Sequence, residues 1–151
     1  MAEGALAGLR LIEMGQLIAG PFCGQLMADH GAEVIKVEPP KVGDAMRNWG
    51  QGVPLWFSVV ARNKKSITLN LREKEGQDIV RKLAAKADFL LLVCRLNDAI
   101  ILRREMVKQR WNPMGIIGPG NPGMYEAQFY AALGKLSEHC ISNVPWYNPR
   151  A

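Results

Sequence analysis

The sequence has few residues that bind metal ions or form disulfide bonds. It contains three cysteines and two histidines in 151 residues, and no Cys-x-x-Cys pair occurs. A structural zinc site needs about four such ligands at short spacings, so we expect no metal. An odd number of widely separated cysteines is typical of free thiols in a reducing compartment. We therefore expect a cytoplasmic protein.

Long apolar runs and blocks of like charge are also missing. No stretch reaches the length of about 18 apolar residues that a membrane-spanning helix requires, and the first residues lack the basic and apolar regions of a secretory signal. The net charge is +5, but lysine and arginine form no block or stripe for a nucleic-acid backbone. We expect neither membrane nor nucleic acid as a partner, and the mild positive charge suits a small anionic ligand.

Apolar segments of strand length alternate with amphipathic segments of helix length. The predicted strands are Leu9–Glu13, Glu33–Val37, Ser66–Leu71, Asp88–Val93, Met114–Ile117 and Cys140–Val144. The predicted helices are Phe22–His30, Glu75–Lys86, Asn97–Gln109 and Pro122–Leu133. Strands separated by helices favour a parallel sheet with crossover connections. The predicted fold class is therefore α/β, with helices flanking a parallel sheet.

A glycine loop between the first strand and the first helix is the most informative local feature. The loop runs from Gly15 to Gly20, Pro21 suits the first turn of a helix, and Gly31 suits its end. Backbone N–H groups at a helix N-terminus can hold an anion, although the same pattern also fits a tight turn without a ligand. Lys64 and Lys65 could meet a phosphate as point charges, or could form a solvated strand entry.

Other candidate groups carry weaker signals. The carboxylates show no spacing typical of an acid–base couple, so we expect them at the surface; they are Asp29, Glu33, Glu38 and Asp44. The segment Gly118–Gly123 matches Gly-x-Gly-x-x-Gly, but its prolines remove N–H donors, so we interpret it as a ligand-edge or structural loop. Cys23 is predicted in the first turn of a helix, as a small buried residue.

Several of these segments together carry a resemblance to a known family. They are Leu11–Glu13, Ile18–Cys23, Leu26–Pro40, Gly43–Asp44, Arg62–Ile67 and Ala87–Asp88. In order and spacing they resemble the family III CoA-transferases, which include formyl-CoA and carnitine CoA-transferases and α-methylacyl-CoA racemase. The resemblance runs from about Leu9 to Leu92. It does not distinguish a transferase from a racemase member.

The resemblance implies a Rossmann-like fold, a homodimer, and transfer of CoA between two carboxylic acids. In the family an aspartate attacks the acyl thioester and forms an anhydride, then an aspartyl-CoA thioester. It implies CoA contacts at the backbone of Ile18 and Ala19 and along the predicted third strand, from Thr68 to Leu71. With the lysine pair, the predicted CoA-binding residues are Ile18, Ala19, Lys64, Lys65, Thr68, Leu69, Asn70 and Leu71. Several members have an arginine where this sequence has Pro39, which removes one expected phosphate contact.

The sequence departs from the family pattern after Leu92. The family has Glu-Asn-Phe-Arg-Pro-Gly soon after this strand, whereas this chain has Val93–Asp98, and no position matches the nucleophilic aspartate. Segments of the tail, such as Trp111–Gly123, are similar to an internal part of periplasmic receptors of the branched-chain amino-acid-binding type. We therefore predict two regions. Residues 1–92 are the N-terminal part of a CoA-transferase large domain, and residues 93–151 are a divergent α/β tail, for which a foreign fusion is one interpretation.

This combination leads to one main hypothesis and two alternatives. The main hypothesis is a truncated or chimeric N-terminal part of a CoA-transferase that is inactive alone, with no catalytic residue of its own. A non-catalytic CoA-binding module is the first alternative. The second is part of a solute-binding protein for a small amino acid, which the tail favours. The acyl donor and acceptor are not predicted, because no substrate-defining residue is matched.

Overall fold

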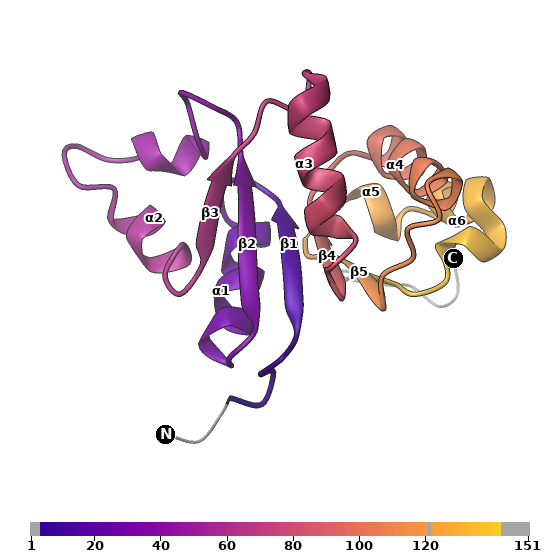
Figure 1. The fold of residues 1–151 in the computed structure, drawn as a ribbon, viewed down its shortest axis with the longest axis horizontal. Coiled ribbons are helices and arrows are strands. Elements are labelled where there is room, and N and C mark those ends of the chain that lie inside the picture. The colour runs from indigo at the N-terminus through magenta and orange to yellow at the C-terminus, as the bar shows by residue number, and fades with distance from the viewer. Residues whose placement is uncertain (1–3, 121, 143–151) are drawn as a thin grey trace.

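A six-stranded sheet, parallel throughout, lies at the centre of the structure (Figure 1). The structure is a computed structural model that describes residues 4–120 and 122–142. The strands are β1 (Arg10–Met14), β2 (Glu33–Glu38), β3 (Lys65–Thr68), β4 (Phe89–Leu92), β5 (Gly115–Gly118) and β6 (Cys140–Ser142). Their order is β3-β2-β1-β4-β5-β6. This is the doubly wound, Rossmann-like order, in which the connections change direction between β1 and β4; the predicted α/β class is confirmed.

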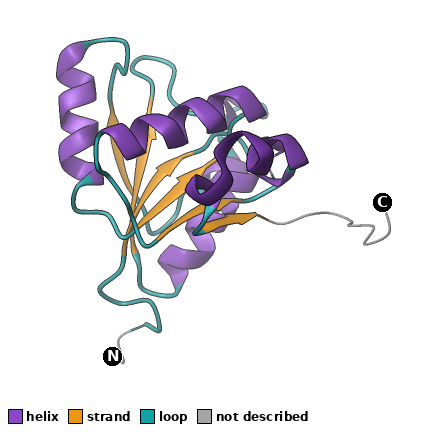
Figure 2. Ribbon diagram, turned by 90° about the vertical axis from the view of Figure 1, so that its right-hand side faces the viewer, coloured by secondary structure: helices purple, strands orange, loops and turns teal. Residues whose placement is uncertain are grey.

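Helices cover both faces of this sheet (Figure 2). They are α1 (Ala19–Asp29), α2 (Leu55–Val60), α3 (Lys74–Ala84), α4 (Leu96–Lys108), α5 (Pro122–Tyr125) and α6 (Ala127–Leu133). Two short 3-10 helices follow β2 and α6, namely η1 (Ala45–Asn48) and η2 (Gly134–Ser137). A parallel sheet needs this cover because both of its faces are apolar over much of their area.

Alternation along the strands divides the core into two layers. Leu11, Val34 and Leu91 pack on one face with Ala28 of α1. Their neighbours point to the opposite face, where Ile12, Leu90 and Ile116 pack with residues of α4 and α6. The register places Glu13 beside Lys36, and both lie on the α1 face because side chains alternate along a strand. The α1 face therefore combines apolar and charged side chains.

The local predictions agree with the structure at helix ends and differ in two segments. Gly31 follows α1 with φ of 101°, a left-handed conformation that glycine adopts readily. The predicted helix Pro122–Leu133 is wrong as one element, because Glu126 has extended backbone and separates α5 from α6. Helix α2 is not predicted, since its six residues are too few to show a helical repeat. The predicted strand Cys140–Val144 is described only to residue 142.

The predicted boundary between residues 92 and 93 falls at the end of a central strand. β4 pairs with β1 on one side and with β5 on the other, so one sheet includes strands from both predicted regions. The likeness of the tail to periplasmic receptors, and its separate origin, stay predictions.

Candidate functional site

A groove lies at the carboxyl ends of β1, β2 and β3. It has a volume of about 270 Å³ and is lined by residues 14–16, 37–40 and 69–72. These are the ends of the three strands and the first residues of the loops that follow them. Loops at this edge of a doubly wound sheet form the usual ligand crevice, because all the strand ends and several helix N-termini meet there.

Close packing of main chain gives the β1–α1 loop its shape. A Cβ atom at Gly15 would lie 3.1 Å from the Gly20 Cα atom and 3.2 Å from Cγ2 of Val93. The loop therefore turns tightly against the segment after β4. Leu17 within it has φ of 64°, in the left-handed region that side chains disfavour. The N-terminus of α1 follows directly and has no side-chain cap.

Four charged side chains are buried beneath this loop and α1, and we name them the buried charge cluster: Glu13, Lys36, Asp44 and Lys64. Lys36 Nζ lies 2.8 Å from Glu13 Oε1 and 2.8 Å from Asp44 Oδ2, and none of these three side chains is more than 2% exposed. Lys64 Nζ lies 2.6 Å from Glu13 Oε2 and is equally buried. The cluster contains two cations and two anions, so its formal charge is zero.

The helix above the cluster is adapted to it. A Cβ atom at Gly24 would collide with Glu13 Oε2, so glycine lets the carboxylate approach α1. Lys64 Nζ also donates a hydrogen bond of 2.5 Å to the Pro21 carbonyl in the first turn of the helix. Burial lowers the pKa of Lys64, while the Glu13 carboxylate acts in the opposite direction. These contacts fix the start of α1 to β1 and to the residue before β3.

A separate ion pair joins the groove-lining residue Glu38 to Arg47. Glu38 accepts hydrogen bonds from Arg47 Nε at 2.7 Å and Nη2 at 2.8 Å, and from Ser66 Oγ at 2.7 Å. The Arg47 guanidinium is the main reason why the pKa of Glu38 falls to about 2. Arg47 in turn lies over the Phe57 ring, 4.0 Å from its centroid. The segment after β2 is thereby fastened to β2, β3 and α2.

The surface placement predicted for the four carboxylates is wrong for Glu38 and Asp44, which are 2% and 1% exposed. Their burial is possible because each has cationic and N–H partners. Asp29 does lie near the surface, where the Arg62 guanidinium lowers its pKa to about 2. Sequence reasoning did not single out Glu13 or Lys36, since a charge inside a short strand reveals nothing of its partner on another strand.

Comparison with known proteins identifies the family. The family model of CoA-transferase family III matches residues 6–99. The chain belongs to CoA-transferase family III. The region that matches contains β1 to β4 and the whole buried charge cluster.

Curated relatives match the same part of this family III chain. It is 57% identical over 90 residues to succinyl-CoA–D-citramalate CoA-transferase of Chloroflexus aurantiacus, which covers 57% of this chain and 22% of that protein. It is 41% identical over 91 residues to formyl-CoA:oxalate CoA-transferase of Bradyrhizobium diazoefficiens, covering 58% and 21%. The chain thus matches about a fifth of the length of these relatives.

Solved structures match a larger share of the chain. A CAIB/BAIF family protein from Brucella suis has a TM-score of 0.68 and 34% identity, covering 78% of this chain and 33% of that one. A hypothetical protein from Mycobacterium tuberculosis has a TM-score of 0.69 and 31% identity, covering 78% and 34%. The likeness in fold therefore extends over more of the family III chain than the 57% that the first relative covers.

Most predicted CoA-binding residues lie at the same edge of the sheet. Leu69, Asn70 and Leu71 line the groove, and Thr68 is the last residue of β3. Ile18 and Ala19 follow the loop whose first residues form the opposite wall. Arg72 also lines the groove and was missed by sequence reasoning, because a single arginine after a strand has no distinctive pattern. It adds a cation to the groove wall that also contains Pro39.

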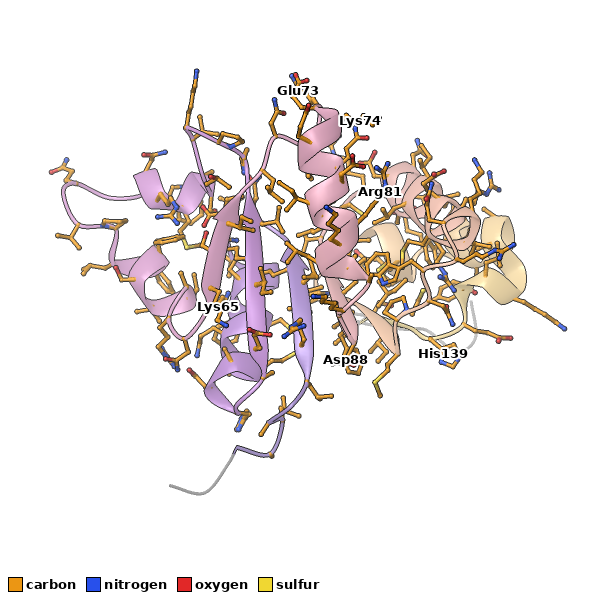
Figure 3. All side chains as sticks on the ribbon, viewed as in Figure 1. Lys65, Glu73, Lys74, Arg81, Asp88 and His139 are labelled. Carbon is orange, nitrogen blue, oxygen red and sulfur yellow. The ribbon has the colours of Figure 1, made fainter. Side chains whose placement is uncertain are left out.

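The predicted lysine pair lies elsewhere. The Lys64 side chain is buried in the cluster, and Lys65 lies at the amino end of β3, where its Nζ is 2.5 Å from Glu33 Oε1. Figure 3 shows Lys65 well away from Glu73 and Lys74, which follow the groove residue Arg72 in sequence. Neither lysine lines the groove. Their assignment to a phosphate stays a prediction.

The glycine-rich segment of the tail also reaches this edge. A Cβ atom at Gly120 would lie 3.3 Å from the Cβ of Ala19, so the loop after β5 touches the start of α1. This position agrees with the interpretation of the segment as a loop at a ligand edge or in a structural turn. The match to the family III model ends at residue 99, before this loop begins.

Metal, membrane and cysteine features add little to the site. Within residues 4–120 and 122–142, no three His, Cys, Asp or Glu residues are grouped to hold a metal ion, and no helix has the length and apolarity to cross a membrane. Cys23 lies beyond the first turn of α1, and burial raises the pKa of its thiol. A raised pKa disfavours the thiolate, which agrees with a packing role for Cys23.

Proposed function

We propose that this chain binds CoA or its thioesters at the groove, as the CoA-binding part of an enzyme that transfers CoA between carboxylic acids. The observation that carries the proposal is membership of family III combined with a groove formed by the loops after β1, β2 and β3. The relatives named above act on succinyl-CoA and formyl-CoA. A small acyl group attached to CoA is therefore the proposed substrate class.

The chemistry of the groove suits an anionic ligand. CoA carries a diphosphate, and phosphate groups are favoured beside backbone N–H groups at a helix N-terminus and beside arginine. The β1–α1 loop leads into a helix N-terminus with backbone N–H groups, and Arg72 is the arginine. A volume of about 270 Å³ lies below the range of about 300–1,000 Å³ typical of complete ligand pockets, so the groove accommodates part of CoA.

CoA binding and CoA transfer need different residues, and we propose that this chain supplies those for binding. Transfer needs an ionised carboxylate free to attack the thioester carbonyl. Glu13 and Asp44 are buried against lysines, and Glu38 is held by Arg47. Each is thus occupied by its ion pair, and none is placed as a nucleophile. We expect CoA binding without turnover by the chain alone.

Two further features of the proposal concern assembly and location. Apolar side chains are exposed at the N-cap of α1 and on α1 and α2: Ile18, Phe22, Leu26, Leu55, Trp56 and Val59. This surface supports the homodimer implied by the family resemblance, because large exposed apolar patches are typical of interfaces. The odd number of widely spaced cysteines supports a reducing compartment such as the cytoplasm.

Calorimetry with the purified chain tests the proposed binding. Titration with CoA should release or absorb heat that saturates, and Arg72→Ala should weaken binding about three- to tenfold, as expected for loss of one exposed charge-assisted contact. Arg81→Ala is the matched control, since Arg81 is an exposed arginine of α3 paired with Asp78 outside the groove. No heat at millimolar CoA would rule out the proposal.

A chromatographic assay separates a binding module from an enzyme. The chain is incubated with succinyl-CoA and a second carboxylic acid, such as citramalate or oxalate, and new CoA thioesters are measured. We expect none. Turnover in proportion to protein concentration would show that the chain is an enzyme by itself and contains a nucleophile of its own.

A further inference from the structure

Two side chains of the buried charge cluster form hydrogen bonds with the main chain of the β1–α1 loop, one at Gly15 and one at Leu17. Lys36 Nζ donates a hydrogen bond of 2.8 Å to the Gly15 carbonyl, before Leu17. The N–H group of Leu17 itself donates a hydrogen bond of 3.0 Å to Asp44 Oδ1. Lys36 and Asp44 are joined by their own ion pair of 2.8 Å. Gly15 and Leu17 are thus both bound to the same Lys36–Asp44 ion pair, which we call the charged unit.

The loop needs this attachment because its conformation is unfavourable on its own. Leu17 has a left-handed backbone, and its side chain is 38% exposed. The next residue, Ile18, caps α1 without any side-chain hydrogen bond to the helix. The contacts that fix the path from β1 into α1 therefore come largely from Lys36, Asp44 and the glycine packing around Val93.

The charged unit is itself rigidly placed. Lys36 lies within β2, where Glu13 of the neighbouring strand holds its ammonium group. Asp44 caps η1 by accepting from the Met46 N–H at 2.9 Å, and its own N–H donates to Glu38 Oε2 at 2.8 Å. In a buried site such charge-assisted hydrogen bonds are strengthened by the low local dielectric. A rigid base of this kind can hold a loop in a strained shape.

We propose that Lys36 and Asp44 are positioning residues for CoA, which shape the β1–α1 loop without touching the ligand. They hold Gly15 and Gln16 in the wall of the groove and start α1 at the correct place beside it. This inference rests on the proposed function, because it concerns the same groove. It assigns to these buried charges a role in ligand affinity in addition to their role in folding.

Two conservative variants of the full chain test the inference. Asp44→Asn replaces the ionised acceptor of the Leu17 N–H by a weaker neutral one and removes the ion pair with Lys36, so it loosens the attachment of the loop. Lys36→Met removes the hydrogen bond to Gly15. Arg10→Met is the control, because Arg10 pairs with Glu33 across the same two strands, at their amino ends. The measurements are the melting temperature, the dissociation constant for CoA, and hydrogen exchange of the peptide that contains residues 15–22.

For folded Asp44→Asn we expect a CoA dissociation constant raised about tenfold and exchange in residues 15–22 faster by about tenfold, whereas Arg10→Met changes neither. If Lys36→Met does not fold, Asp44→Asn decides alone. A folded Asp44→Asn chain with unchanged loop exchange and unchanged CoA affinity would overturn the inference. If the unaltered chain fails to bind CoA, the proposed function is wrong. Hydrogen exchange then tests the attachment of the loop by itself, and unchanged exchange of residues 15–22 in Asp44→Asn would disprove it.

Discussion

The two faces of the sheet stabilise the protein in different ways. On the face covered by α1, strand residues Glu13, Lys36 and Glu38 are buried as ion pairs among apolar neighbours. On the face covered by α3, α4 and α6, the strands contribute Ile12, Leu90 and other apolar side chains. Arg103 is buried on that side too, but it belongs to a helix and donates to the Leu136 carbonyl.

The buried charged side chains lie on the side of the sheet next to the groove-lining loops. Charged side chains are expensive to bury and add little net stability compared with apolar side chains of the same size. Here they are concentrated under the loops after β1 and β2, which line the groove. The apolar face supplies stability through burial, whereas the charged face fixes a particular loop conformation. Variants on each face should therefore differ in which property they change.

The largest effect is expected from breaking the cluster at its centre. Glu13→Gln removes the charge that faces both Lys36 and Lys64 and leaves two buried ammonium groups without their carboxylate. We expect the free energy of unfolding to fall by about 3–5 kcal/mol, as for other buried ion pairs that lose one partner. Urea unfolding followed by circular dichroism measures the change.

Glu33→Gln is the matched control for this variant. Glu33 also pairs with two cations, Arg10 and Lys65, but its side chain is 29% exposed. Its loss should cost less than about 1 kcal/mol, because exposed ion pairs contribute little. An equal loss in the free energy of unfolding for the two substitutions would show that burial does not determine how much an ion pair of this sheet contributes to stability.

The apolar face is expected to respond somewhat less to a single change. Leu90→Ala opens a cavity in a position that is fully buried between β1 and β5. We expect a loss of about 3 kcal/mol in the free energy of unfolding, with CoA affinity unchanged once the chain is folded. Val107→Ala, at an exposed position of α4, should change stability by less than about 0.5 kcal/mol. A weakened CoA affinity in folded Leu90→Ala would contradict the division of roles between the faces.

The smallest effect is expected from the pH dependence of the ion pair at the groove wall. Arg47 lowers the folded-state pKa of Glu38 to about 2, while the unfolded value is near 4.3. The pair therefore contributes stability that is complete above about pH 4.5 and is lost as the pH falls toward 2. Arg47→Met should be less stable than the unaltered chain by about 1–2 kcal/mol at pH 6. The difference should shrink toward zero near pH 2.

Urea unfolding at several pH values between 6 and 2 measures this difference. Comparing the two chains at each pH removes the contribution of Asp29, whose pKa is also lowered to about 2 but by Arg62. A difference that stays constant over this pH range would mean that Arg47 stabilises the protein through its contact with Phe57 and not through Glu38.

Local features of the sequence predict much of the framework. Gly31 follows the end of α1 and Pro21 lies in its first turn, because each of these depends on a few neighbouring residues. The CoA contacts at Thr68–Leu71 came from the family resemblance, and that role stays a prediction. The motifs between Leu9 and Leu92 are sufficient to indicate the CoA-transferase relationship, and the family match to residues 6–99 confirms it. A turn or motif consists of consecutive residues, so the sequence shows it directly.

The sequence by itself determined the α/β class, the order of most elements and the family. Only the tertiary structure decided that Glu13, Lys36 and Lys64 form one buried cluster, that Asp44 holds Leu17, and that Lys64 lies under α1. Glu13 and Lys36 are 23 residues apart, and Glu13 and Lys64 are 51 apart. Their contact depends on strand order and register, which are set by packing of the whole sheet, and a charge has no local pattern that names its distant partner.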